Sequence, residues 1–160
     1  MRGMIFMDES NFHDQAGMER SFNDYFADVL RQCPGTFNAM LDLHLHSCDY
    51  AGRWVILTAQ VQPWMSNPAG IVHGGITATL LDTALGQLCR YYSGGKVIRT
   101  IQVEVSYLRA VPVGATVCIR ADLHKMGAGI CFAVGSLWVQ DRPDRLLATA
   151  SGSYAMSDPE

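Results

Sequence analysis

The longest apolar run in the chain, residues 75–92, is the feature that most constrains the fold. It contains no proline, and Leu81, Leu85 and Leu88 recur at the spacing that places side chains on one side of an α-helix. Other apolar residues widen this stripe around most of the helix: Ile76, Leu80, Ala84 and Tyr92. We therefore expect a long helix that is buried on nearly all sides. Asp82 is the one carboxylate in the run, and burying an ionisable group is costly unless it is paired, hydrogen-bonded or used in function.

Before this run, the sequence predicts one helix and a β-hairpin. Residues 18–32 place apolar side chains on one side of a helix, and Pro34-Gly35 ends it. Apolar and polar residues alternate over residues 37–45, which is typical of a half-buried strand. Residues 54–61 return as its hairpin partner after a turn at residues 49–52.

After the run, Ser93-Gly94-Gly95 stops the helix, and four strands are expected to follow as an antiparallel meander. The expected strands span residues 97–108, 116–125, 130–140 and 146–156. A helix that is apolar nearly all round needs a curved sheet around it, so the predicted class is α+β with the hot-dog arrangement. A second copy would satisfy the open edge of such a sheet, so we expect at least a dimer.

Length and composition indicate one globular domain. Of the 160 residues, 49% are hydrophobic and 17% are charged, and we expect a loose lead-in (1–17), a single domain (18–156) and a polar tail (157–160). The net charge of −3 argues against binding nucleic acid through phosphate neutralisation. The five cysteines show no C-x-x-C pair, which is typical of reduced thiols in a cytoplasmic protein. No run reaches the ~20 apolar residues that span a membrane.

Two features of the long helix could carry chemistry. Gly74 lies where a loop enters the helix, and first-turn N–H groups with the helix dipole can polarise a carbonyl, although a plain glycine helix start explains it equally well. Asp82 is a candidate base or nucleophile, although an internally paired Asp also fits. Eight residues separate the two, or about 12 Å along a helix. Because one chain's Asp82 lies too far from its own Gly74, the spacing suggests sites composed across a dimer.

Several other polar residues have a structural interpretation beside a functional one. Asn67 offers an amide, but Asn-Pro commonly begins a turn, and Thr100 can be an ordinary strand residue. No Ser or Cys lies in a recognised elbow beside His73, so we favour a histidine that fixes the loop. His44 and His46 lack a clear third zinc ligand, so no metal site is expected. Packing or solvation also explains further candidates: Cys89, Arg99, Arg109 and Lys125.

With these residues in view, the sequence resembles the hot-dog acyl-CoA thioesterases of the phenylacetate-degradation type. The resemblance is carried by Asn67, by His73-Gly74-Gly75 and by the segment from Thr79 to Gly86. Downstream, residues 103–110 look like the family's next strand. The resemblance covers about residues 37–156 and includes the order of the expected elements.

This resemblance implies a homodimer, often a dimer of dimers, that hydrolyses acyl-CoA thioesters without a metal or a cofactor other than the CoA of the substrate. It implies that the Gly74 N–H polarises the thioester carbonyl and that Asn67 orients the reacting groups. Asp82 of the facing subunit would act as base or nucleophile, and Thr100 would position the water.

The resemblance also implies where substrate binds. His73 and Gly75 belong to the expected substrate-binding loop, and Arg109 is the expected contact of the CoA phosphates. Gln102, where an acidic residue is common, and Arg99, beside the catalytic threonine position, depart from the family pattern and bear on substrate choice.

The leading hypothesis is therefore a thioesterase for a small, medium-chain or aryl acyl-CoA. An acyl-thioester hydratase or dehydratase on the same fold is one alternative, and the Asn…His-Gly-Gly…Asp pattern counts against it. A non-catalytic acyl-CoA-binding protein is another, and the presence of both Gly74 and Asp82 counts against that one. Because one fold hosts several activities, the acyl group is left open.

Overall fold

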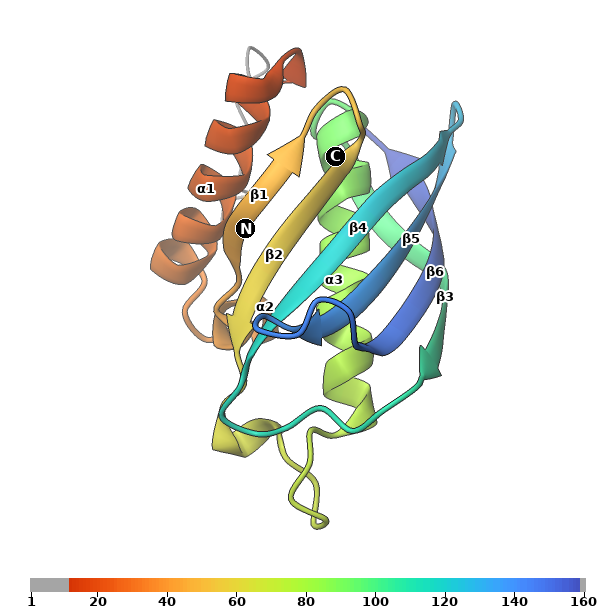
Figure 1. The fold of residues 1–160 in the computed structure, drawn as a ribbon. Helices are drawn as coiled ribbons and strands as arrows, with labels where there is room; N and C mark the ends of the chain where they lie inside the picture. Colours follow the sequence, from red (N-terminus) through yellow and green to blue (C-terminus); the bar gives the residue numbers. More distant parts are fainter. Residues whose placement is uncertain (1–11, 159–160) are drawn as a thin grey trace.

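The computed structural model describes residues 12–158, and Figure 1 shows a six-stranded antiparallel sheet curved around one long helix. This confirms the predicted α+β architecture. The order of the strands is β1-β2-β4-β5-β6-β3, and a second helix, α1, lies beside β1. In chain order the elements are α1 (Gln15–Gln32), α2 (Phe37–Leu41), β1 (His44–Asp49), β2 (Trp54–Gln60), the short 3-10 helix η2 (Pro63–Met65), α3 (Gly74–Tyr92), β3 (Val97–Tyr107), β4 (Thr116–Met126), β5 (Ile130–Val139) and β6 (Leu146–Ser157).

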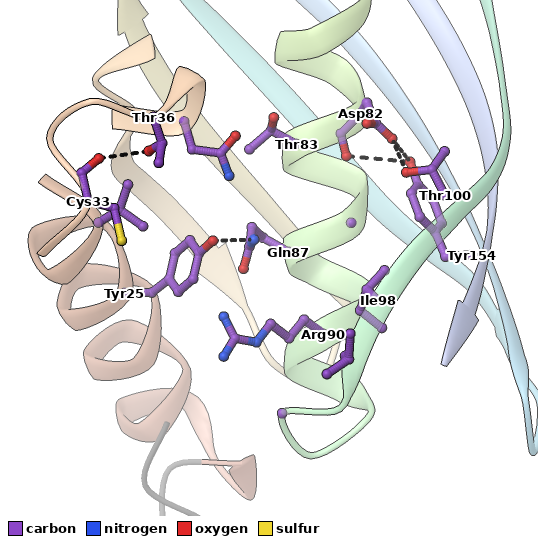
Figure 2. A pocket seen from close by; sticks show the side chains of 15 residues that line it. Tyr25, Cys33, Thr36, Asp82, Thr83, Gln87, Arg90, Ile98, Thr100 and Tyr154 are labelled. Carbon is purple, nitrogen blue, oxygen red and sulfur yellow. Dashed lines mark hydrogen bonds between the residues drawn. The ribbon is translucent and has the colours of Figure 1, made fainter. Parts of the chain in front are cut away.

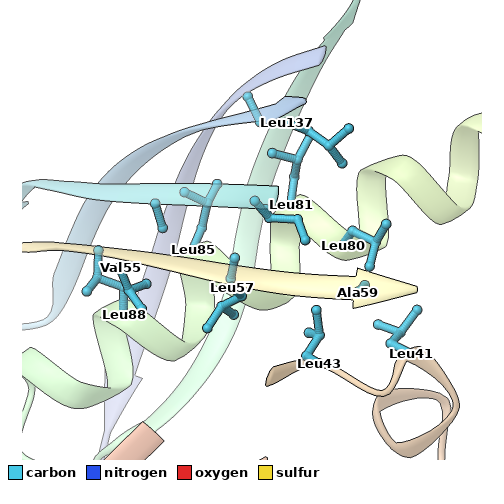
Figure 3. Close-up of a cluster of buried hydrophobic side chains, with 14 of the residues drawn as sticks. Leu41, Leu43, Val55, Leu57, Ala59, Leu80, Leu81, Leu85, Leu88 and Leu137 are labelled. Atoms are coloured by element: carbon cyan, nitrogen blue, oxygen red, sulfur yellow. The ribbon is translucent and has the colours of Figure 1, made fainter. Parts of the chain in front are cut away.

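The long helix α3 is held to the sheet by a face of leucines. Those with no exposed surface are Leu80, Leu81, Leu85 and Leu88. Figure 3 shows this face among buried side chains of the sheet, including Leu57 of β2 and Leu137 of β5. Each fully buried leucine contributes about 1.5–3 kcal/mol relative to an exposed one. The leucine face is therefore the main attachment of α3 to the sheet.

The opposite side of α3 is open in the single chain, so the prediction of a helix buried on nearly all sides is wrong. Asp82, Gly86 and Arg90 on that side are only partly buried. The reason is that the sheet curves around one side of α3, while α1 packs mainly on β1 (Figure 1). Among residues 12–158, no helix combines the length and the apolar character needed to cross a membrane.

The first helix begins at Gln15, ahead of the predicted start at Met18. Asp14 explains the difference, because its carboxylate accepts a hydrogen bond from the Gly17 N–H at 2.6 Å and caps the helix. Phe12 packs against Tyr91 with ring centroids 5.4 Å apart, so the later part of the expected lead-in contacts the core. Residues 1–11 of that lead-in and residues 159–160 of the expected tail lie outside the described residues.

The strand predicted over residues 37–45 is wrong in its first half, which forms the short helix α2. Thr36 caps this helix by accepting a hydrogen bond from the Ala39 N–H at 3.4 Å, and Asp42 ends it in the left-handed conformation at φ 47°. Ala39 and Leu41 are both buried although they lie on a helix. They are two residues apart, which is also the spacing of buried side chains on a strand. Strand β1 begins only at His44.

The predicted meander is correct for β4, β5 and β6 and wrong for β3. Strand β3 pairs with β6, whereas β4 pairs with β2 and places Ile119 opposite Leu57. The connection over residues 108–115 runs from β3, at one edge of the sheet, to β4 in the middle of the sheet, and so it is not a tight hairpin. Within residues 12–158, no strand pairs with the outer edge of β3.

Gly135 in β5 lets α3 approach the sheet closely, because a Cβ there would lie 2.7 Å from the Arg120 carbonyl oxygen and 3.1 Å from the Leu85 side chain. We predict that Gly135→Ala lowers the free energy of unfolding by about 1–3 kcal/mol, since its neighbours must shift. Urea denaturation measures this change. Gly35→Ala is the matched control, because no atom lies within 4 Å of a Cβ there. Equal stability of the two variants would contradict this packing.

Candidate active site

The start of α3 is capped by its own histidine. His73 Nδ1 accepts a hydrogen bond from the Gly75 N–H at 2.9 Å, and the His73 carbonyl accepts from Ile76 and Thr77. The His73 side chain therefore caps the helix that follows the loop. The Gly74 N–H has no acceptor among residues 12–158. It is therefore the donor at the positive end of the helix dipole that a ligand oxygen can take.

The loop before α3 uses Asn67 in a turn. Its Oδ1 accepts a hydrogen bond from the Ala69 N–H at 2.9 Å, and its carbonyl accepts from the Gly70 N–H at 2.9 Å. The loop is tied to the helix start by the His73 N–H, which donates to the Met65 carbonyl at 2.8 Å. The side-chain oxygen of Asn67 thus stabilises the loop, and its amide nitrogen is the group that remains for a substrate or a water.

The carboxylate of Asp82 is held by two hydroxyl groups from the sheet. Thr100 Oγ1 donates to Asp82 Oδ1 at 3.0 Å, and the Tyr154 hydroxyl donates to the same oxygen at 3.1 Å (Figure 2). Both donors come from paired strands, because Thr100 of β3 is the register partner of Tyr154 of β6. The carboxylate is partly exposed, so a water can reach it.

A β-bulge puts Thr100 in position. The register of β3 shifts between Thr100 and Gln102, which leaves Ile101 as the extra residue. Bulges occur often beside active sites because they redirect a side chain. Ile101 is 55% exposed, whereas the Thr100 side chain points at Asp82. In a regular strand the side chains alternate between the two faces of the sheet. The bulge interrupts this alternation at Ile101, and the Thr100 side chain faces α3.

Tyr154 was missed by the sequence analysis, although it is the most buried polar group of the site. Its ring has no exposed surface, and burial raises the pKa of its hydroxyl, with the Asp82 carboxylate acting in the same direction. The hydroxyl therefore stays protonated and remains a donor to Asp82. The available signal was its place in β6 after the small inward residues Ala148, Ala150 and Gly152, where a buried tyrosine hydroxyl needs a partner.

Asp82 and Thr100 lie between two hollows. One is a groove of about 460 Å³ that runs along the open side of α3 toward Gly95 and is lined on the far side by α1 (Figure 2). The other is a hollow of about 310 Å³ lined by Thr79 and Tyr107, whose hydroxyl donates to the Gly74 carbonyl at 3.0 Å. A ligand can therefore approach the carboxylate from two directions.

Gly74 and Asp82 do not meet within one chain. They are eight residues apart on the same straight helix, or about 12 Å along its axis. Arg109 is also separate from Asp82: it lies past the end of β3, and its Nη1 donates to the Leu146 carbonyl at 2.7 Å. The structure thus brings together Asp82 with Thr100, and Gly74 with the loop residues His73 and Gly75.

Known proteins resemble this chain in sequence. Residues 69–144 match the family model described as the thioesterase superfamily. Acyl-coenzyme A thioesterase THEM4 of Xenopus laevis is 29% identical over 99 residues, which is 62% of this chain and 43% of that protein. The chain therefore spans less than half the length of this relative.

Solved structures resemble it over most of its length. Thioesterase superfamily member 2 of zebrafish superposes with a TM-score of 0.73 at 22% identity, covering 91% of this chain and 99% of that chain. A putative thioesterase of Ralstonia eutropha, described as a phenylacetic acid degradation-related protein, gives a TM-score of 0.68 at 25% identity and covers 82% of this chain and 98% of that chain. The predicted hot-dog fold is confirmed, and residues 69–144 of the chain are similar to the thioesterase superfamily.

Proposed function

We propose that this protein is an acyl-CoA thioesterase that hydrolyses a small, medium-chain or aryl acyl-CoA to the free acid and CoA, at sites shared between two copies of the chain. One observation carries the proposal. Helix α3 carries the Asp82 carboxylate, which Thr100 and Tyr154 hold by hydrogen bonds. At its positive end the same helix carries the Gly74 N–H, which has no hydrogen-bond acceptor within residues 12–158. A base and an oxyanion donor are the two groups that hydrolysis of a thioester needs.

In this mechanism the Gly74 N–H donates to the thioester carbonyl oxygen and stabilises the negative charge that develops on it. Asp82 takes a proton from a water, and the water oxygen forms a bond to the carbonyl carbon. The carbon–sulfur bond of the tetrahedral intermediate then breaks, the carbonyl re-forms, and CoA leaves as a thiolate that takes up a proton.

We assign Asp82 as the base because of how its two oxygens differ. Oδ1 accepts hydrogen bonds from Thr100 and Tyr154, which fix the orientation of the carboxylate. No donor among residues 12–158 contacts Oδ2, so that oxygen can hold the attacking water. In this assignment Thr100 orients the carboxylate rather than binding the water directly.

The shared site follows from distance. A catalytic group must approach the carbonyl to about 3–3.5 Å, whereas Gly74 and Asp82 of one chain are about 12 Å apart. The outer edge of β3, which no strand within residues 12–158 pairs, offers a second copy a place to dock. A dimer of dimers, a cytoplasmic location, the absence of a separate cofactor, and contacts of Asn67 and Arg109 with substrate remain parts of the proposal.

Gly74→Pro is expected to lower kcat by about 10²–10³-fold, because it removes the N–H that holds the oxyanion. Proline is suited to the first position of a helix, and His73 already has the extended backbone that a residue before proline needs. Gly74→Ala is the matched control: it keeps the N–H, and its Cβ would lie 3.5 Å from the Tyr107 ring, an ordinary contact. The measurement is thiol release from octanoyl-CoA. Equal losses in both variants would remove the N–H from the mechanism.

Mixing two inactive variants tests whether the site is shared. Asp82→Ala and Gly74→Pro homodimers should each keep about 1% or less of wild-type turnover. Re-associated together, they should recover about a quarter of wild-type turnover, because half of the dimers are mixed and each of those has one intact site. Thiol release after mixing measures this recovery. Inactivity of the mixture would show that each chain forms its own site, and acyl-CoA binding without turnover by wild type would point to the non-catalytic alternative.

Tyr154→Phe should lower kcat by about 10- to 100-fold, because Asp82 loses one of its two donors and its orientation. The ring is retained, so the fold should be retained as well. Tyr92→Phe is the control, because it removes a hydroxyl that donates to the Tyr50 carbonyl at 2.6 Å, away from the groove. Steady-state kinetics with circular dichroism distinguishes the two. Wild-type kcat in Tyr154→Phe would exclude this residue from the site.

A further inference from the structure

A third hollow, of about 420 Å³, shares no lining residue with the two hollows beside Asp82. Its walls come from the loop before α3, the connection after β3 and the turn between β5 and β6, at the end of the fold where α3 begins (Figure 1). The apolar residues that line this loop hollow are Ile71, Ala110, Pro112, Val139 and Leu147. Its size and lining are typical of a site for a small ligand with an apolar body.

Backbone contacts join the loop hollow to the start of α3. Ile71 forms an isolated β-bridge with Pro112, and the Leu108 N–H donates to the Leu147 carbonyl at 2.9 Å. These contacts connect all three segments that form the walls. Ile71 lies three residues before Gly74, so the loop hollow and the proposed oxyanion donor belong to the same loop.

Two arginines without an acidic partner also line the loop hollow. Arg142 and Arg145 come from the exposed turn between β5 and β6, where the Arg142 N–H donates to the Val139 carbonyl at 2.8 Å and the Arg145 N–H to the Arg142 carbonyl at 3.1 Å. Asp141 and Asp144 belong to the same turn. Even so, neither guanidinium has an ion pair or a hydrogen bond within residues 12–158. Both guanidinium groups can therefore bind an anion from outside the chain.

Arg109 adds a further positive charge beside the loop hollow. Its Nη1 donates to the carbonyl of Leu146, the residue before Leu147 of the lining. A guanidinium has five N–H donors, so this bond leaves others for a ligand. Guanidinium groups bind phosphate in a bidentate geometry and stack on aromatic rings. An apolar hollow bordered by arginines is therefore suited to a nucleotide, which combines a flat base with phosphates.

We propose that the loop hollow binds the nucleotide of CoA, with the adenine among the apolar residues and the phosphates at Arg142 and Arg145. This inference rests on the proposed thioesterase function, because it places the thioester at the Gly74 N–H and the pantetheine arm between the two sites. Exposed arginines would also attract an acidic carrier protein, but such a partner needs no hollow. The loop hollow therefore favours free acyl-CoA over acyl groups attached to a carrier protein.

Two thioesters with the same acyl group test the proposal: octanoyl-CoA and S-octanoyl-N-acetylcysteamine, which lacks the nucleotide. The double variant Arg142→Met, Arg145→Met should raise KM for octanoyl-CoA at least about tenfold and keep kcat within about twofold. It should change kcat/KM for the N-acetylcysteamine ester by less than about twofold, because that ester does not reach the loop hollow. Ala110→Trp keeps the charges and fills the hollow, so it should raise KM for octanoyl-CoA as well.

Adenosine 3′,5′-bisphosphate tests the loop hollow directly. It should compete with octanoyl-CoA in wild-type protein and inhibit the arginine double variant at least about tenfold more weakly. Calorimetry should show the same difference in binding without any turnover. Inhibition that is equal in the two proteins would overturn the proposal.

Arg31→Met combined with Lys96→Met is the matched control. It also removes two positive charges, from side chains that pair with Asp28 and Asp158 and do not line the loop hollow. This control should keep the wild-type KM, and an equal rise in KM would reduce the effect to net charge and overturn the proposal. An equal loss with octanoyl-acyl carrier protein in the arginine double variant would overturn it too. Hydrolysis of neither small thioester by wild type would instead contradict the thioesterase function, and calorimetry with the bisphosphate would still decide on the loop hollow.

Discussion

The rest of the structure depends on the burial of the leucine face of α3 against the curved sheet. An α-helix has a fixed angle between successive side chains, so fixing Leu81 and Leu85 against the sheet also fixes the direction of Asp82. That direction is toward the junction of β3 and β6, where Thr100 and Tyr154 are register partners. The packing of the leucine face against the sheet therefore holds α3 in place and also sets the direction of the Asp82 carboxylate.

Most of the fold could be predicted because most of its signals are local. The apolar period of α3, the glycines after it and the alternation in β4, β5 and β6 are each readable from neighbouring residues. Two features depend on more than that. Residues 37–41 have a spacing that suits both a strand and a helix, and the cap at Thr36 decides between them. Strand β3 pairs with β6, which lies about fifty residues later in the chain, and the apolar periodicity of a strand does not indicate its partner.

Some residues of the candidate site could likewise be recognised from their own segment of sequence, and others depend on contacts between distant segments. Gly74 and Asp82 were identifiable because a glycine helix start and a carboxylate in an apolar run are unusual within their own segments. Thr100 was assigned only through the family resemblance, and the bulge beside it is visible only in the sheet. Tyr154 was missed, because its importance arises from a contact between distant elements: 72 residues separate it from Asp82.

The position of β3 at the edge beyond β6 has a consequence for the order of folding. Among residues 12–158, β6 is the only strand that pairs with β3, and it lies about fifty residues later in the chain. Closing such a distant pairing is slow compared with forming a hairpin. Because Thr100 and Tyr154 are opposite each other on these two strands, both donors reach Asp82 in the same event. A chain in which β3 and β6 have not yet paired therefore has a helix α3 whose Asp82 carboxylate lacks both of its hydroxyl donors.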